Sequence, residues 1–128
     1  MLTPMDDTLW HQIASTFDHV GTSDPRFFDR HWFAFYAPDG NGAAQVTMGV
    51  YRNMNVLDGA AVVIRDGRQY NLRASQSLGR DFATRLGPLA IEPVTPLEPF
   101  RLTLDQPGHL RGEIDWRAVV PPHEEQPH

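Results

Sequence analysis

Acidic and imidazole side chains ahead of the longest apolar stretch are the groups best suited to acid–base chemistry. Asp18 and His19 are adjacent, Asp24 follows shortly, and Tyr51 adds a phenol further along the chain. A histidine beside carboxylates can accept or donate a proton near neutral pH. The same aspartates also suit turns in which a side-chain oxygen accepts a backbone N–H. The catalytic and the structural interpretation both stay open, and the sequence does not decide whether the protein is an enzyme.

Aromatic and amide side chains form a second candidate site, for an apolar ligand with a polar head group. An aromatic wall could hold the ligand's tail while amides and a phenol orient its head. Core packing explains the aromatic residues equally well, and turn formation explains the asparagines. The candidate ligand-binding residues are Trp32, Phe35, Tyr36, Tyr51, Asn53, Asn55 and Trp116.

Composition excludes several kinds of chemistry. The chain has no cysteine, which removes disulfides, thiolate catalysis and cysteine-based zinc sites. All 11 basic residues are arginines, so a Schiff-base lysine and a P-loop lysine are absent as well. The histidines and glutamates of the tail, such as His123 and Glu124, follow no metal-ligand spacing, and His11 and His31 are expected at the surface or an interface. No metal and no cofactor is expected.

Charge and hydropathy limit the possible binding partners and the cellular location. A net charge of −5 argues against non-specific binding of nucleic acid. No apolar run approaches the ~18 residues of a membrane-spanning helix. The first residues lack the basic and apolar regions of a secretory signal, so a cytoplasmic location is expected.

The elements that must position these groups are predicted to be β-strands. Residues 32–36 and 43–53 form the strands of a long hairpin around the turn Pro38–Gly42. In the returning strand Val46 and Met48 share one face, and Gln45 shares the other with its odd-numbered neighbours. A second hairpin joins residues 60–65 and 68–74 through Asp66-Gly67, a strong turn signal.

Further strands are predicted in the second half of the chain, over residues 89–94, 100–104 and 109–119. Four prolines restrict strand pairing between residues 88 and 99 to edges or bulges. A short helix is predicted over residues 9–17, and a single helical turn around residues 81–86. The whole chain, residues 1–128, is thus predicted to be one all-β domain, an antiparallel barrel or strongly curled sheet that closes its edges, with a short N-terminal helix.

Four stretches give the chain a family resemblance: FDHVGTSDPRFFDRHWFAFYAPDG, MGVYRNMNVLDG, GPLAIEPVTPLEPFRLTLD and GEIDWRAVVPPHEEQPH. Together they resemble the N-terminal domain of bacterial proteins related to the AttH-like and carotenoid 1,2-hydratase group. The resemblance spans nearly the whole chain from Phe17 onward. It implies a lipocalin-like barrel, the first half of a two-barrel protein, with a pocket for an isoprenoid- or lipid-like molecule. The Pro-Pro step in the tail, residues 120–128, agrees with this expectation, since such a step usually leads to a further element.

Three functions are therefore expected from the sequence. The first is binding of a hydrophobic small molecule without catalysis. The second is an enzyme of hydratase, isomerase or cyclase type acting on an alkene, with Asp18, His19, Asp24 and Tyr51 as acid–base groups. The third is a non-catalytic packing half, whose partner is a second barrel domain or a homodimer mate.

Overall fold

The protein was analysed as a computed structural model that describes residues 2, 4–7, 22–79 and 84–123. The helix predicted over residues 9–17 lies outside this part of the chain. Two short 3₁₀ helices are described, η1 (Pro4–Asp7) and η2 (Arg52–Met54). The rest of the regular structure in the described ranges is β-strand, which confirms the all-β class.

The first sheet consists of four long antiparallel strands that follow one another in sequence order. Its two hairpins are joined by η2, and Asp66 and Gly67 both have positive φ (50° and 71°), as a type I′ turn requires. Both hairpins were predicted. The strands are β1 (Asp29–Tyr36), β2 (Gly42–Tyr51), β3 (Val56–Arg65) and β4 (Arg68–Ser77).

The second sheet is also a four-stranded antiparallel meander. Its first strand has only two residues, Arg85 and Leu86, which pair with Ala90 and Leu89 across a tight Gly-Pro turn. The helical turn predicted around residues 81–86 is therefore wrong for these two residues, and residues 81–83 lie outside the described part of the chain. The strands are β5 (Arg85–Leu86), β6 (Leu89–Pro93), β7 (Phe100–Gln106) and β8 (Leu110–Trp116).

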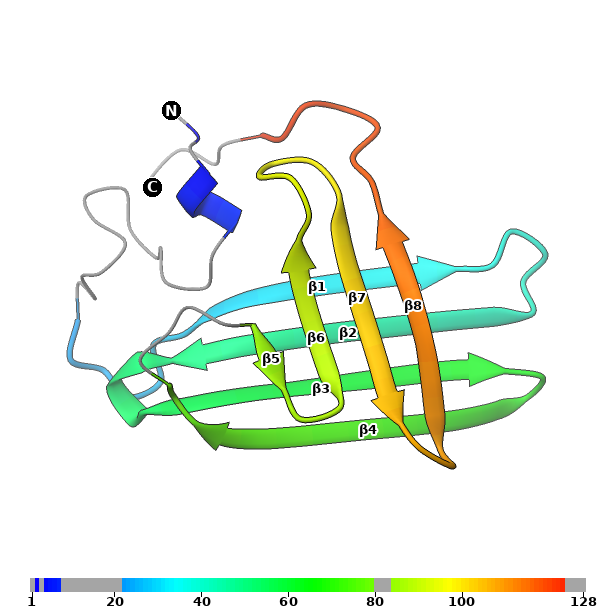
Figure 1. Cartoon of the computed structure of the whole chain (residues 1–128), viewed down its shortest axis with the longest axis horizontal. Coiled ribbons are helices and arrows are strands. Elements are labelled where there is room, and N and C mark those ends of the chain that lie inside the picture. The colour runs from blue at the N-terminus through cyan, green and yellow to red at the C-terminus, as the bar shows by residue number, and fades with distance from the viewer. Residues whose placement is uncertain (1, 3, 8–21, 80–83, 124–128) are drawn as a thin grey trace.

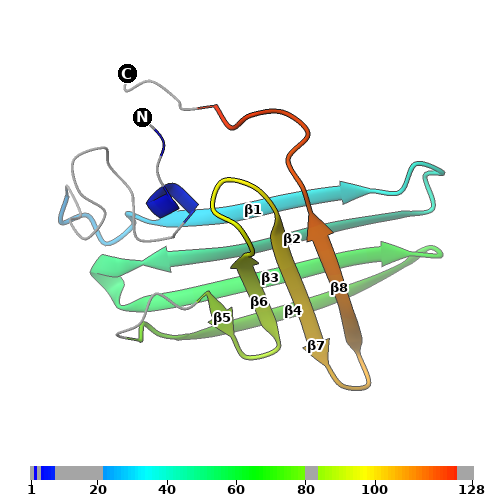
Figure 2. The same cartoon turned by 45° about the horizontal axis from the view of Figure 1, so that its top comes forward.

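The two sheets form the two layers of a sandwich, and the strands of the second sheet cross those of the first at a steep angle (Figures 1 and 2). No strand of one sheet pairs with a strand of the other among the described residues, so the predicted barrel closure is wrong. Strands that cross steeply cannot run side by side, so among the described residues each of the edge strands β1, β4, β5 and β8 pairs with one neighbour only.

The core lies between the sheets and follows the predicted alternation. On β2, Val46 and Met48 are fully buried, whereas Gln45 on the other face is exposed. Because side chains alternate along a strand, one face of each sheet supplies the core cluster between them. Its other large buried side chains are Val50, Leu57, Leu72, Leu86, Leu89, Ile91, Phe100, Leu102 and Leu104.

The first sheet extends beyond the second at one end. Figure 1 shows the β1–β2 and β3–β4 turns reaching past β8, the last strand of the second sheet. At this end no described element covers the core-facing side of the first sheet. This overhang positions the main candidate site.

Candidate functional site

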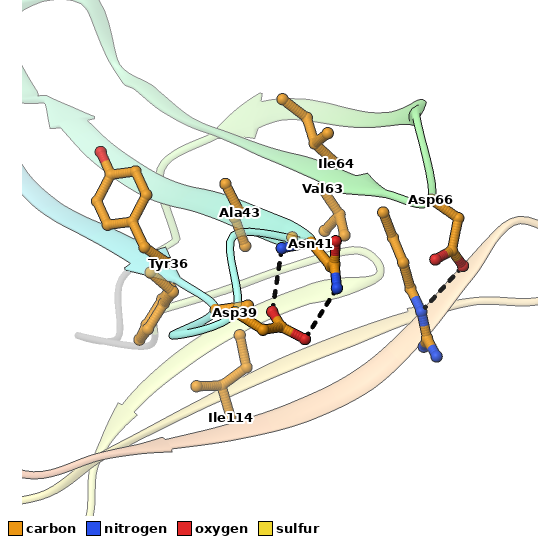
Figure 3. Close-up of a pocket in the computed structure, with 13 residues that line it drawn as sticks. Tyr36, Asp39, Asn41, Ala43, Val63, Ile64, Asp66 and Ile114 are labelled. Atoms are coloured by element: carbon orange, nitrogen blue, oxygen red, sulfur yellow. Dashed lines mark hydrogen bonds and ion pairs between the residues drawn. The ribbon is translucent and has the colours of Figure 1, made fainter.

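A cavity of about 590 Å³ lies where the overhang of the first sheet meets β8. This volume is within the range of roughly 300–1,000 Å³ typical of small-molecule sites. Figure 3 shows its walls, which come from the β1–β2 turn, the β3–β4 turn and β8. The lining residues are Phe35, Tyr36, Ala37, Asp39, Asn41, Gly42, Ala43, Ala44, Val63, Ile64, Arg65, Asp66 and Ile114.

The floor of this cavity is apolar. Phe35 faces Ala44 across the β1–β2 pair, and Ala44 faces Val63 across the β2–β3 pair, so the three side chains form one row on the core-facing side. Ile114 of β8 closes the cavity from the second sheet. Phe35, Val63 and Ile114 also pack against the buried core. The floor is therefore an accessible continuation of the hydrophobic core.

The rim of the cavity is charged. The Asp39 carboxylate accepts hydrogen bonds from the Asn41 backbone N–H (3.0 Å) and from its side-chain amide (3.1 Å). These bonds hold the pKa of Asp39 below its usual range, so it is ionised at neutral pH. Arg65 and Asp66 form an exposed ion pair of 3.5 Å on the opposite turn. Fixed charges above an apolar floor suit an amphipathic molecule whose head group stays near water.

Of the aromatic residues predicted to bind a ligand, only Phe35 and Tyr36 line this cavity. Trp116 lies deeper between the sheets, in edge contacts with Phe33 (ring centroids 5.8 Å apart) and Phe100 (5.9 Å). Trp32 points to the outer face of the first sheet and is 60% exposed. The aromatic residues predicted to form one wall therefore lie in three separate places.

The polar residues predicted for the site lie at the other end of the first sheet. The Tyr51 hydroxyl accepts a hydrogen bond from Arg30 (2.8 Å). The Asn53 amide donates to the carbonyl oxygens of Thr22 and Asp24 (2.8 and 2.9 Å). Asn55 takes the left-handed conformation (φ 57°) that ends η2. Tyr51 therefore contacts β1, and Asn53 and Asn55 stabilise loop structure, all at a distance from the cavity.

Among the predicted acid–base residues, the structure describes Asp24 and Tyr51. Asp24 accepts the backbone N–H of Arg26 (2.8 Å) and pairs with its guanidinium (2.9 Å). The guanidinium holds the pKa of Asp24 below its usual range. This is the turn geometry that the sequence offered as the structural interpretation. Asp18 and His19 lie outside the described residues, so the structure does not bring a proposed catalytic set together.

A second cavity, of about 420 Å³, includes in its lining Asp7, a residue that the sequence did not indicate as part of a site. It lies beneath the loop between β6 and β7 and is lined by Asp7, Phe100 and Trp116, together with residues 117–123. His31 packs edge-on against Phe100 nearby (5.3 Å between ring centroids). The expectation that His31 is a surface or interface residue is wrong, because its place on the core-facing side of β1 withdraws it from water.

Asp7 and His31 connect the N-terminal segment to the sandwich. His31 Nε2 donates to the carbonyl oxygen of Asp7 (2.9 Å), so the neutral ring carries its proton there. The Asp7 carboxylate accepts the backbone N–H of Leu97, a residue in the left-handed conformation (φ 63°). Burial raises the pKa of Asp7, an effect increased by Asp6 and opposed by the Leu97 N–H. Burial also lowers the pKa of His31 to about 4.

Replacing Asp7 by alanine is expected to destabilise the fold by about 1–2 kcal/mol, because the Leu97 N–H loses its acceptor at a residue that is only 8% exposed. Asp7→Asn keeps an acceptor oxygen and serves as the matched control. Urea unfolding at neutral pH measures both variants. Equal stability of Asp7→Ala and the wild type would show that this contact does not hold the loop.

Within the described ranges, no three histidine, aspartate or glutamate side chains are grouped so that they could hold a metal ion. Among the same residues, the structure has no helix with the length and apolar character needed to cross a membrane.

These features define a two-layer antiparallel β-sandwich protein with an apolar cavity at its open end. The chain belongs to DUF8625, a family of unknown function whose match covers residues 2–127. It matches no curated protein and no solved structure.

Proposed function

We propose that the protein binds a hydrophobic small molecule with a polar head group in the cavity between the overhang and β8. The observation that carries this proposal is the row Phe35–Ala44–Val63, an apolar part of the core-facing side that remains accessible beside Ile114. The ligand's apolar part would lie on this row and be removed from water, which contributes about 0.8 kcal/mol per CH₂ group. Its head group would lie near Asp39, Arg65 and Asp66.

The resemblance to the AttH-like and carotenoid hydratase group suggests an isoprenoid- or lipid-like ligand. Binding without catalysis is better supported than an alkene-directed enzyme. The cavity rim carries Asp39, whose lowered pKa makes it a poor proton donor. Asp24 and Tyr51 are engaged in contacts at the other end of the first sheet.

A titration with the fluorescent fatty acid cis-parinaric acid tests this proposal. The matched variants are Val63→Asn and Val62→Asn, because these adjacent half-buried residues of β3 face opposite sides of the first sheet. Val63→Asn is expected to weaken binding at least tenfold, since a tenfold change needs only about 1.4 kcal/mol. Val62→Asn is expected to bind like the wild type.

Thermal melts of both variants show whether each is folded at the temperature of the titration, so that a loss of binding can be distinguished from unfolding. Saturable binding that both variants retain would place the ligand elsewhere, and the absence of saturable binding by the wild type would contradict the proposal.

A further inference from the structure

The outer face of the first sheet carries few charged side chains, namely Arg30, Asp58 and Arg73. Its side chains lie in four rows across the four strands, as the strand register shows. Large apolar side chains on it are well exposed: Trp32 by 60%, Tyr36 by 73% and Ile64 by 44%. The rows are Arg30–Gly49–Asp58–Ser75, Trp32–Thr47–Ala60–Arg73, Ala34–Gln45–Val62–Asn71 and Tyr36–Ala43–Ile64–Gln69.

The outer face of the second sheet has the opposite character. Ion pairs cross it from strand to strand and suit it to contact with water. They join Arg85 to Glu92 (3.0 Å), Arg101 to Asp115 (2.9 Å) and Arg111 to Asp105 (2.6 Å). The two outer faces therefore differ in chemistry, and the face of the first sheet is the one suited to a protein partner.

We propose that the outer face of the first sheet binds a second copy of this chain, face to face, about a two-fold axis parallel to the strands. Such an axis places β1 over β4 of the other copy and β2 over its β3, and each row meets the same row. Aligned packing of two sheets, with the strands within about 30° of each other, is a common arrangement. The proposal rests on how the rows then complement one another.

The second row provides the main contact. In this arrangement Trp32 of one copy lies over Arg73 of the other, and the reciprocal contact forms on the opposite side of the axis. Arg73, Ala60 and Thr47 line a hollow of about 370 Å³ on this face, which offers the indole a place to insert. An exposed tryptophan that enters a hollow beside an arginine combines apolar burial with a cation–π contact, as interface hot spots do.

The outer rows are complementary in size and in charge. In the fourth row, Ile64 lies over Ala43 of the other copy, so a large side chain meets a small one. In the first row, Asp58 lies over Gly49, which has no side chain, and beside Arg30 of the other copy. Asp58 has no ion-pair partner within its own chain among the described residues, whereas Arg30 stacks on Phe28 (4.5 Å) and donates to Tyr51. The facing copy would supply the missing opposite charge.

The area of the face is sufficient for a dimer. Four strands about 4.8 Å apart and four same-face rows about 6.8 Å apart cover on the order of 500 Å² on each copy, or about 1,000 Å² in total. This is near the lower limit for specific interfaces. A dissociation constant in the micromolar range is therefore expected, with a measurable monomer fraction on dilution.

Sedimentation velocity over a range of protein concentrations tests the proposal. The wild type is expected to form a dimer, and Trp32→Ala and Val62→Arg are each expected to weaken it at least tenfold. Trp32 is largely exposed, so its replacement leaves the core intact. Val94→Ala is the matched control, because Val94 is also exposed (57%) but lies outside this face, and it is expected to leave the dimer unchanged.

A wild type that stays monomeric at the highest concentration would overturn the proposal. A dimer that tolerates both Trp32→Ala and Val62→Arg would also overturn it, because the contact would then use another face. The ligand proposal is tested separately by Val63→Asn, because Val63 faces the other side of the sheet, whereas Tyr36, Ala43 and Ile64 of the fourth row also line the edge of the cavity.

Discussion

Lowering the pH from about 7 to about 4 is expected to destabilise the fold by about 3 kcal/mol through His31 alone. The ring has a pKa of about 4 in the folded protein against 6.5 for an ordinary histidine. Burial is the main cause of this lowered pKa, and the contact with the Asp7 carbonyl offsets it only in part. Within the described chain Nδ1 has no hydrogen-bond partner that could stabilise a second proton.

The direction of this effect follows from proton binding. Below pH 6.5 the unfolded chain takes up a proton on His31, whereas the folded protein does so only near pH 4. The stabilisation present above pH 6.5 is therefore lost as the pH falls through this window. The Asp7 carboxyl acts in the opposite direction, because its raised pKa favours the folded state as the pH falls.

Urea unfolding of the wild type and of His31→Gln at several pH values isolates this contribution. Glutamine can donate to the Asp7 carbonyl but does not titrate, so the variant is expected to lose about 3 kcal/mol less than the wild type over the window. Equal losses by both proteins would show that His31 titrates normally and is not buried as described.

The second large effect is expected at Gly59 of β3, which lies against Leu86 and Leu89 of the second sheet. A Cβ atom at this position would lie 2.8 Å from Leu89 Cδ2, 3.2 Å from Leu86 Cδ2 and 3.0 Å from the Thr47 carbonyl oxygen. The leucine side chains can adjust, but the Thr47 oxygen belongs to the backbone of the neighbouring strand. Gly59→Ala is therefore expected to destabilise the protein by about 1–3 kcal/mol.

Gly112→Ala is the matched control for this substitution. Gly112 lies on β8, and a Cβ atom there would meet nothing within 4 Å. Because glycine in a strand is less favourable than alanine by roughly 0.5–1 kcal/mol, this variant is expected to be as stable as the wild type or slightly more stable. If Gly59→Ala proved equally harmless, the sheets could not pack as closely at β3 as the structure shows.

Strands and their faces were predictable because the signals are local. The alternation of Val46 and Met48 with Gln45 predicted the buried side of β2, and Asp66-Gly67 predicted the second hairpin. Barrel closure was not predictable in the same way, since it depends on how two sheets cross and not on any single stretch. The two-residue strand β5 was missed because its pairing partner, and not its own sequence, defines it.

The candidate site was predicted only in part, for the same reason. Phe35 and Tyr36 were found because they end an aromatic strand directly before a turn. Asp7 contacts His31 across 24 residues and Leu97 across 90 residues, and no local pattern indicates contacts of that length. The nearest signal is the position of His31 itself, which shares the core-facing side of its strand with Phe33 and Phe35.

Methyl NMR during the titration with cis-parinaric acid is the most direct test of ligand binding in the cavity between the overhang and β8. Shifts are expected to concentrate on the methyl groups of Ala44, Val63 and Ile114, which line the cavity floor, while those of Val62 remain unchanged. Shifts confined to Val119 and Val120, beside the second cavity, or to the outer face around Val62 would contradict ligand binding in the cavity between the overhang and β8.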